Sequence, residues 1–320
     1  MSNQRVIGVP SGLVYGASKS GKTLTLGRAM PCALFLTEDA TGAGVQSILA
    51  AAGIMPKWRA TPTLQNLTAA LSALRDAFAK AKTEGRVFQF DGVAIDDLTL
   101  MADASLERWK RRKEQAVNKF WAWDQLRAAL YQIRVLLREI GLPYGITAHA
   151  RHPTYDDKAG RRRRGGPSLP SKEQTDTLPV ICSTVVRTQV HDGSWPYAWN
   201  GALSCDPCSV DWVEGDRNGV APPIGPMNLG ELFRLGGHVV RRPKGLEWME
   251  EVTERVATQV AADPESVEDV KARAVTVLVA KGLPPIHVRW AIIDGLDRYY
   301  LRVACDPLAA LNSASGVLTM

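Results

Sequence analysis

A glycine-rich segment near the N-terminus constrains the fold more than any other feature of this sequence. Residues 16–23 read Gly-Ala-Ser-Lys-Ser-Gly-Lys-Thr and fit the pattern G-x-x-x-x-G-K-[ST]. An apolar segment, residues 5–15, precedes them, and a stretch suited to a helix, residues 23–30, follows. A phosphate-binding loop requires this order of strand, loop and helix, because its backbone N–H groups turn towards phosphate oxygens at a helix N-terminus. We therefore expect an α/β fold that binds a nucleotide.

The pattern assigns a role to each residue of this loop. Lys22 is expected to reach the β and γ phosphates of ATP, and the Thr23 hydroxyl is expected to bind Mg²⁺. The alternative is a glycine-rich turn with a solvated lysine. Backbone N–H groups of the remaining loop residues are expected to hold the phosphates: Gly16, Ala17, Ser18, Lys19, Ser20 and Gly21.

Two apolar, β-rich stretches end in carboxylates. The first, residues 87–95, leads to Asp96 and Asp97, and the second leads to Glu38 and Asp39. Ligands collect at strand C-termini in open α/β sheets, so Asp96 is expected to hold the metal. Asp97 is expected either to hold a water or to cap the next helix. Glu38 is the first candidate for activating the attacking water and Asp39 the second, and a plain loop role remains open for both.

A further short strand is expected over residues 142–148, with His149 at its end. A polar side chain at that position can contact the γ-phosphate or the attacking water and transmit the nucleotide state to the following segment. The alternative is a surface histidine beside a basic loop.

Two basic segments indicate a nucleic-acid partner. Cations and aromatic residues alternate between residues 106 and 123, as in single-strand grooves, where cations neutralise phosphates and rings stack on bases. An amphipathic helix with solvated charges and core tryptophans is the alternative. The second segment lies in residues 151–179, which we expect to be irregular, and its alternative is a solvated linker. The expected nucleic-acid contacts are Lys110, Arg111, Arg112, Lys113, Arg161, Arg162, Arg163 and Arg164.

Together these motifs resemble the RecA-like core, and more specifically the phage-encoded ATP-binding proteins of the RecA superfamily, including single-strand annealing proteins. The resemblance covers roughly residues 5–235 and rests mainly on the glycine-rich loop. Later matches are the segments Gly165-Gly166-Pro167 and Asp216-Arg217. The second is similar to a shortened Lys-Asn-Arg-Phe-Gly motif of RadA-type proteins, although Gly215 stands where that motif has its lysine.

The resemblance implies a largely parallel sheet between helices, bound ATP and Mg²⁺, and a ring or filament of identical subunits. It also implies that the loop after the His149 strand contacts DNA. Arg217 is the residue that would reach the nucleotide of a neighbouring subunit. We place the RecA-like core in residues 1–237.

The sequence predicts a small helical C-terminal region over residues 238–320, because apolar residues recur there at helical spacing. These helices would pack on the core, dock a neighbouring subunit or bind a partner protein. No apolar run reaches the roughly 18 residues that a membrane span needs, and five cysteines in a chain of 320 residues do not indicate a disulfide framework. We expect a cytoplasmic protein without a membrane partner.

The sequence thus predicts a Mg²⁺-dependent ATPase that acts on single-stranded DNA in phage-type recombination, annealing or replication. The net charge of +6 supports this partner only because the positive charge is concentrated in the two basic segments. The alternative is a nucleotide-gated assembly protein, or a DNA-packaging or helicase-type motor, whose basic loop holds another partner.

Overall fold

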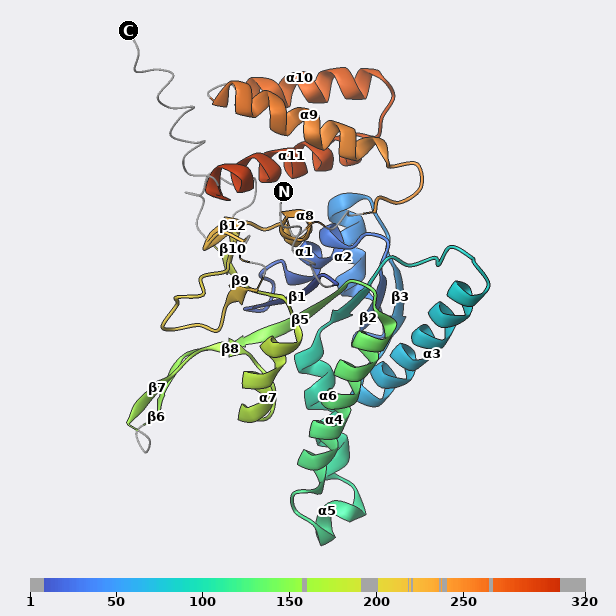
Figure 1. The fold of residues 1–320 in the computed structure, drawn as a ribbon, viewed down its shortest axis with the longest axis vertical. Coiled ribbons are helices and arrows are strands. Elements are labelled where there is room, and N and C mark those ends of the chain that lie inside the picture. The colour runs from blue at the N-terminus through green and yellow to red at the C-terminus, as the bar shows by residue number, and fades with distance from the viewer. Residues whose placement is uncertain are drawn as a thin grey trace, which may run out of the picture.

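The computed structural model describes residues 9–156, 160–190, 201–217, 219, 221–235, 237, 241–264 and 267–305. A mixed, mostly parallel sheet lies between helices (Figure 1), so the chain has an α/β fold. In spatial order its main strands are β12 (Ile224–Pro226), β10 (Gly201–Ser204), β9 (Thr184–Val190), β1 (Ser11–Gly16), β5 (Tyr144–Arg151), β4 (Val93–Asp96), β2 (Leu34–Thr37) and β3 (Lys57–Ala60).

The strands that carry the predicted site residues are all parallel. β1 pairs with β5, with Gly16 opposite His149, and β2 pairs with β4, with Thr37 opposite Asp96. β4 and β5 are parallel neighbours. The segments that follow these four strands therefore emerge at one edge of the sheet, which is where ligands bind in open α/β folds.

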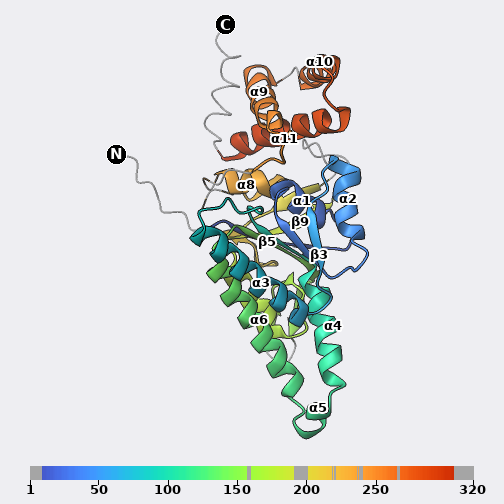
Figure 2. The ribbon, with the colours of Figure 1, turned by 90° about the vertical axis from the view of Figure 1, so that its right-hand side faces the viewer.

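Helices cover both faces of the sheet (Figure 2), and a hydrophobic core lies on each face. Side chains of β1 alternate between them, since Val14 belongs to one core while Leu13 and Tyr15 belong to the other. The helices on the Val14 face are α1 (Lys22–Ala29), α2 (Ala43–Ala52) and α8 (Leu229–Leu235). Those on the opposite face are α3 (Leu64–Thr83), α4 (Leu98–Lys110) and α6 (Trp121–Ile140).

A helical arm projects from the sheet (Figures 1 and 2). Its two long helices are α4 and α6, and the short helix α5 (Lys113–Val117) lies at its tip. Asp97 caps the N-terminus of α4, where its side chain accepts a hydrogen bond from the Thr99 N–H at 2.7 Å. The first helix of the arm therefore begins directly after Asp97, the residue that follows β4.

Three helices close the chain: α9 (Trp248–Ala262), α10 (Val267–Ala280) and α11 (Pro285–Cys305). α11 contacts α2, α8 and β12. The buried side chains of Met249, Val256 and Trp290 belong to the same hydrophobic core as Val14 and Leu26 of the sheet and α1. Of the three placements that the sequence left open, the structure shows packing on the core of the same chain.

Three sequence predictions of local structure are wrong. Residues 151–179 are not irregular, because short antiparallel strands need only local backbone pairing, as between β6 and β7. The elements in this segment are β6 (Thr154–Asp156), β7 (Arg161–Arg163), β8 (Gly166–Pro167), α7 (Lys172–Thr177) and the start of the 3-10 helix η1 (Leu178–Ile181). Residues 209–214, for which the flanking Gly, Pro and Asp turn residues predict a further strand of the sheet, form no strand, since the Ser209 hydroxyl accepts a turn hydrogen bond from the Trp212 N–H. Residues 87–92 are not part of the predicted strand, which begins only at Val93 as β4. Phe88 instead packs edge-on against Phe78 of α3.

None of the helices in the described part of the chain combines the length and apolar character needed to cross a membrane.

Residues 1–237 expressed without the C-terminal helices are expected to lose cooperative unfolding, because the apolar surface that faces α9 and α11 becomes exposed to water. Thermal unfolding followed by circular dichroism, with binding of a hydrophobic dye as second readout, checks this. A sharp transition without dye binding would show that the boundary near Gly237 separates an independent domain.

Candidate functional site

The loop between β1 and α1 depends on two glycines. Gly21 has a φ angle of 83°, and a Cβ built there would lie 2.7 Å from Met227 Cε. Gly16 lies so close to Thr188 that no Cβ fits between them. The Thr188 hydroxyl on β9 is also 2.6 Å from the Ser20 hydroxyl. Glycine is therefore required at both positions, and β9 supports the loop through Thr188, a contact that no motif indicated.

The Lys22 side chain folds back over this loop. Its Nζ donates hydrogen bonds to the carbonyl oxygens of Ala17 at 2.8 Å and Gly16 at 3.3 Å. Burial lowers the pKa of Lys22, while nearby carboxylates oppose this effect: those of Asp97, Asp96 and Glu38. The ammonium group thus lies where it can exchange loop carbonyls for phosphate oxygens.

Thr23 and Asp96 meet at the edge of the sheet. Thr23 Oγ1 donates a hydrogen bond to Asp96 Oδ2 at 2.9 Å. Thr147 on β5 holds the other oxygen of the same carboxylate, and burial raises the pKa of Asp96. One hydroxyl and one carboxylate fit Mg²⁺, which in nucleotide sites takes few protein ligands besides phosphate and water. No cluster of three or more His, Cys, Asp or Glu side chains suited to a metal occurs among the described residues.

Gly44, in the first turn of α2, leaves space beside this pair. A Cβ built on Gly44 would lie 3.3 Å from Asp96 Oδ2 and 3.6 Å from Thr23 Cγ2. The backbone there is helical, so its conformation does not require glycine, and alanine would favour the helix by about 1 kcal/mol. Asp96 has little freedom to move, because Thr23 and Thr147 hold it. The open space therefore suits a hydrated ion.

Gly44→Ala is expected to weaken binding of ATP with Mg²⁺ by about tenfold, which corresponds to about 1.4 kcal/mol. The thermal unfolding temperature should stay unchanged or fall slightly, because the close approach to Asp96 offsets the gain in helix propensity. The added methyl group occupies space beside Asp96. Titration calorimetry with and without Mg²⁺ checks this, and binding of ATP in excess chelator serves as the control. Equal Mg²⁺ dependence in the variant and the parent would contradict the placement of the ion.

Glu38 and Asp39 have different surroundings in the structure. Glu38 Oε2 accepts a hydrogen bond from the Asp97 N–H at 2.6 Å, and burial raises the pKa of Glu38. Asp39 is half-buried and accepts hydrogen bonds from the backbone N–H groups of Thr41 and Ala43, both at 2.8 Å. Bonds from the Thr41 hydroxyl and backbone lower the pKa of Asp39. Glu38 thus lies beside the other carboxylates, whereas Asp39 binds backbone N–H groups of the turn that leads into α2.

His149 faces Asp97 at the end of β5. Its Nε2 lies 3.4 Å from Asp97 Oδ2, and its side chain is 36% exposed. The pKa of His149 is lowered first by burial and then by the charge of Lys22. The Thr99 hydroxyl accepts a hydrogen bond from the His149 N–H at 2.9 Å and donates one to the Ser168 carbonyl at 2.7 Å. This hydroxyl joins β5, α4 and the segment after β8, and no motif pointed to it.

Asp97→Asn is expected to change the pH dependence of stability. Burial first, and Asp96 next, raise the pKa of Asp97 to about 6 from 3.8. An acid with a higher pKa in the folded state than in the unfolded state lowers the free energy of unfolding as the pH rises from the unfolded-state pKa to the folded-state pKa. Relative to the parent, the variant should therefore gain about 2 kcal/mol of unfolding free energy between pH about 4.5 and about 7.5. Urea unfolding at both pH values is the measurement, and parallel pH profiles would refute the expectation.

Arg217 lies far from the loop of its own chain. β11 (Gly215–Asp216) places Asp216 opposite Thr184, the first residue of β9. Thr188, which contacts the loop, lies further along the same strand. Arg217 donates a hydrogen bond to the Val180 carbonyl at 2.8 Å. Within one subunit it does not join the site, and its contribution to a neighbour's nucleotide stays a prediction.

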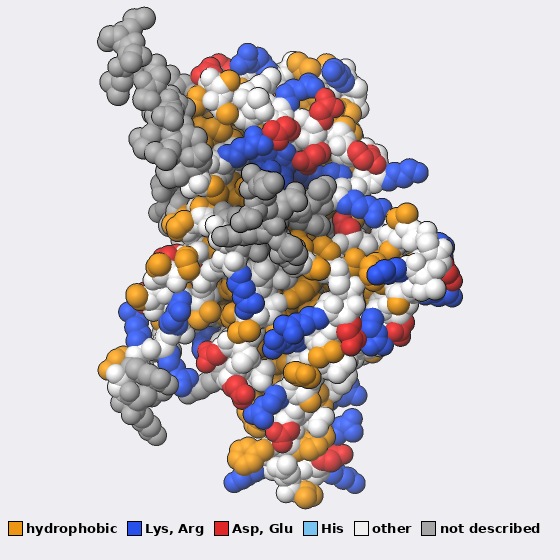
Figure 3. Space-filling view, viewed as in Figure 1, with side chains coloured by type: hydrophobic (Ala, Val, Ile, Leu, Met, Phe, Trp, Pro, Cys, Tyr) orange, Lys and Arg blue, Asp and Glu red, His pale blue; other side chains and the backbone are white. Residues whose placement is uncertain are grey.

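The first basic segment lies at the tip of the helical arm (Figure 3). Phe120 and Trp123 are exposed there, at 62% and 36%, whereas Trp109 is buried. Lys110 Nζ lies 5.8 Å from the Trp123 ring and forms an ion pair with Glu107. One tryptophan thus lies in the core, as in the amphipathic-helix interpretation, and a platform of rings and cations is exposed at the tip, where contact with nucleic acid stays a prediction. The cations of this platform are Lys110, Arg111, Arg112 and Lys113.

The second basic segment forms the β6–β7 hairpin (Figures 1 and 3). Arg162 forms an ion pair with Asp211 at 2.8 Å. Arg164 Nε donates a hydrogen bond to the Trp212 carbonyl at 2.9 Å. The side chain of Arg161 lies outside the described residues. The chain itself thus engages part of this positive charge, and the hairpin projects from the edge of the sheet at which the loop lies.

No protein-family model and no curated protein sequence matches this chain. The function is therefore inferred from the geometry of the site.

Proposed function

We propose that this chain is a Mg²⁺-dependent ATPase with a RecA-like core that acts on single-stranded DNA in phage-type recombination, annealing or replication. The observation that carries the proposal is the pairing of Thr23 with Asp96 beside Lys22. The loop, the hydroxyl and the carboxylate come from β1, α1 and β4, and this combination is what phosphoryl transfer from ATP requires.

Each residue of the site has a role in this reaction. Backbone N–H groups of residues 16–21 and the Lys22 ammonium hold the phosphates. Thr23 and Asp96 hold Mg²⁺, which when bound neutralises charge on the β and γ phosphates. Glu38 orients the attacking water and accepts its proton as the oxygen–phosphorus bond to the γ-phosphate forms and the bond to the β-phosphate breaks. Its raised pKa suits a general base.

A hydrogen-bonded route supports coupling between this reaction and DNA. His149 faces Asp97, and the Thr99 hydroxyl links the His149 backbone to the Ser168 carbonyl. Ser168 directly follows β8, which pairs with the end of β5 next to the basic hairpin. A change at His149 is therefore transmitted by direct contacts to the base of the hairpin. The cap at Asp97 extends the same route to the arm through α4.

The subunits are proposed to assemble into a ring or filament, since Arg217 does not reach the site of its own chain. In a protein of this kind the cation from one subunit would complete the nucleotide site of the next. The competing function is that of a nucleotide-gated assembly protein, or of a packaging or helicase-type motor. The effect of single-stranded DNA on ATP turnover distinguishes the two functions. ATP turnover that DNA does not change, together with ATP-dependent assembly, would favour the competing function.

Lys22→Ala is expected to abolish ATP turnover, because the ammonium group that binds the β and γ phosphates is removed. Phosphate release measured with Mg²⁺ checks this, and Lys80→Ala is the control, because Lys80 is an exposed lysine of α3 outside the loop. Turnover at the parent rate in Lys22→Ala would defeat the assignment of the loop.

Replacement of Arg161, Arg162, Arg163 and Arg164 by serine is expected to reduce the stimulation of ATP turnover by single-stranded DNA and its dependence on salt, because fewer counterions are released on binding. Basal turnover should remain at the parent level. The assay is ATP turnover with and without single-stranded DNA over a salt series. Stimulation and a salt slope identical to those of the parent would remove the hairpin from the DNA site.

A further inference from the structure

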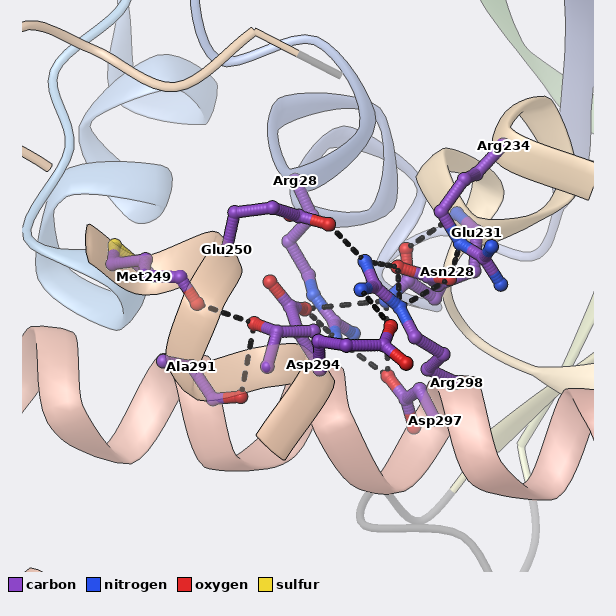
Figure 4. A network of polar contacts seen from close by, with 12 residues as sticks. Arg28, Asn228, Glu231, Arg234, Met249, Glu250, Ala291, Asp294, Asp297 and Arg298 are labelled. Atoms are coloured by element: carbon purple, nitrogen blue, oxygen red, sulfur yellow. Dashed lines mark hydrogen bonds and ion pairs between the residues drawn. The ribbon is translucent and has the colours of Figure 1, made fainter. Parts of the chain in front are cut away.

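The helix that begins with the nucleotide-binding loop ends in a buried arginine. Arg28, in the last turn of α1, is 4% exposed. Its Nη2 donates hydrogen bonds to Asp294 Oδ1 and Asp297 Oδ2, both at 2.5 Å, and its Cζ lies 4.5 Å from the centre of the Trp290 ring. Asp294 and Asp297 are on α11 (Figure 4), and Trp290 belongs to the same helix. The C-terminal helices therefore hold the far end of the loop helix by charge and by stacking.

A second connection leads from Arg28 back to the loop itself. Arg28 Nη1 donates a hydrogen bond to the Met227 carbonyl at 3.0 Å. The Met227 side chain lies against Gly21, with its Cε 2.7 Å from the position of a Cβ on that glycine. Next to it, Asn228 Nδ2 donates to both carboxylates, to Asp294 at 3.2 Å and to Asp297 at 3.3 Å. Both ends of the loop helix thus contact the same buried cluster.

This cluster is energetically sensitive to its geometry. Asp294 and Asp297 are 2% and 0% exposed, and Arg242 balances the second negative charge through an ion pair with Asp294 at 2.9 Å. A buried ion pair adds little net stability, but loss of one partner leaves an uncompensated charge. Such a cluster therefore selects one relative position of the elements that it joins.

We propose that Arg28, Met227 and the Asp294–Asp297 pair are positioning residues of the nucleotide site, through which the C-terminal helices set the affinity of the loop for nucleotide. The inference rests on the proposed function, because it requires nucleotide to bind at this loop. By linkage, nucleotide binding and the α1–α11 contact stabilise each other.

The same interface supplies a matched control. Arg298 of α11 is 2% exposed and pairs with Glu231 of α8 at 2.7 Å and with Glu250 and Glu254 of α9 (Figure 4). These ion pairs of Arg298 run to α8 and α9, whereas those of Arg28 start from α1. Arg298 itself is as buried as Arg28, although Glu250 and Glu254 are about half exposed. Glu250 also pairs with Arg242, and the Glu231 N–H donates to Asn228 Oδ1, so this network borders the first cluster. Its own ion pairs join α11 to α8 and α9.

The experiment compares two double variants, each of which removes one charge of either sign. Arg28→Met with Asp297→Asn leaves the pair of Arg242 with Asp294 in place. Arg298→Met with Glu231→Gln is the control. Titration calorimetry with ATP and Mg²⁺ measures affinity, and urea unfolding measures stability. In the parent and in both variants, hydrogen exchange with and without nucleotide follows the turn of α11 that contains Asp294.

The first variant is expected to bind ATP about tenfold more weakly than the parent, within the usual range of coupling between sites, while the control binds within about twofold of it. Nucleotide should slow exchange in the α11 turn of the parent and of the control. Equal affinity losses in both variants, unchanged affinity in the first, or an α11 turn in the parent that nucleotide does not protect would overturn the inference. A parent that binds no ATP would instead refute the proposed function.

Discussion

The site depends on the parallel pairing of β1, β5, β4 and β2. Because these strands run in the same direction and in register, Gly16, Thr37, Asp96 and His149 all arrive at one edge of the sheet. The hydroxyl of Thr23 then meets the Asp96 carboxylate, and Lys22 lies in the field of the neighbouring acids. A slip of one residue in β4 would turn Asp96 to the opposite face of the sheet and separate it from the loop.

Threonine hydroxyls hold much of the site together. Thr147 fixes Asp96, Thr188 contacts Ser20 of the loop, and the Thr99 hydroxyl joins His149 to Ser168. A buried hydroxyl that both donates and accepts connects two strands without adding a charge. This keeps the buried carboxylates oriented while it leaves Lys22 and the proposed Mg²⁺ as the balancing positive charges.

The C-terminal helices and the helical arm have different relations to this site. The arm begins directly after Asp97, so its helix continues from a carboxylate of the site to an exposed platform of rings and cations. The C-terminal helices instead reach the loop helix from outside, through charges that are buried together with Arg28. The arm leaves its rings and cations exposed, whereas the C-terminal helices pack into the core and pair with the end of α1.

The sequence by itself determined the loop at residues 16–23 and the candidate carboxylates, because glycine spacing and apolar runs ending in acids are local patterns. It also predicted a helical region at residues 238–320, where apolar residues recur at helical spacing. Tertiary structure alone separated Glu38 from Asp39, because that choice depends on the Asp97 N–H from another strand. It alone paired Arg28 with Asp294 and Asp297, more than 260 residues away, and folded the arginine segment into a hairpin. Contacts between distant residues leave no periodic trace in a single sequence, whereas turns, strands and helices do.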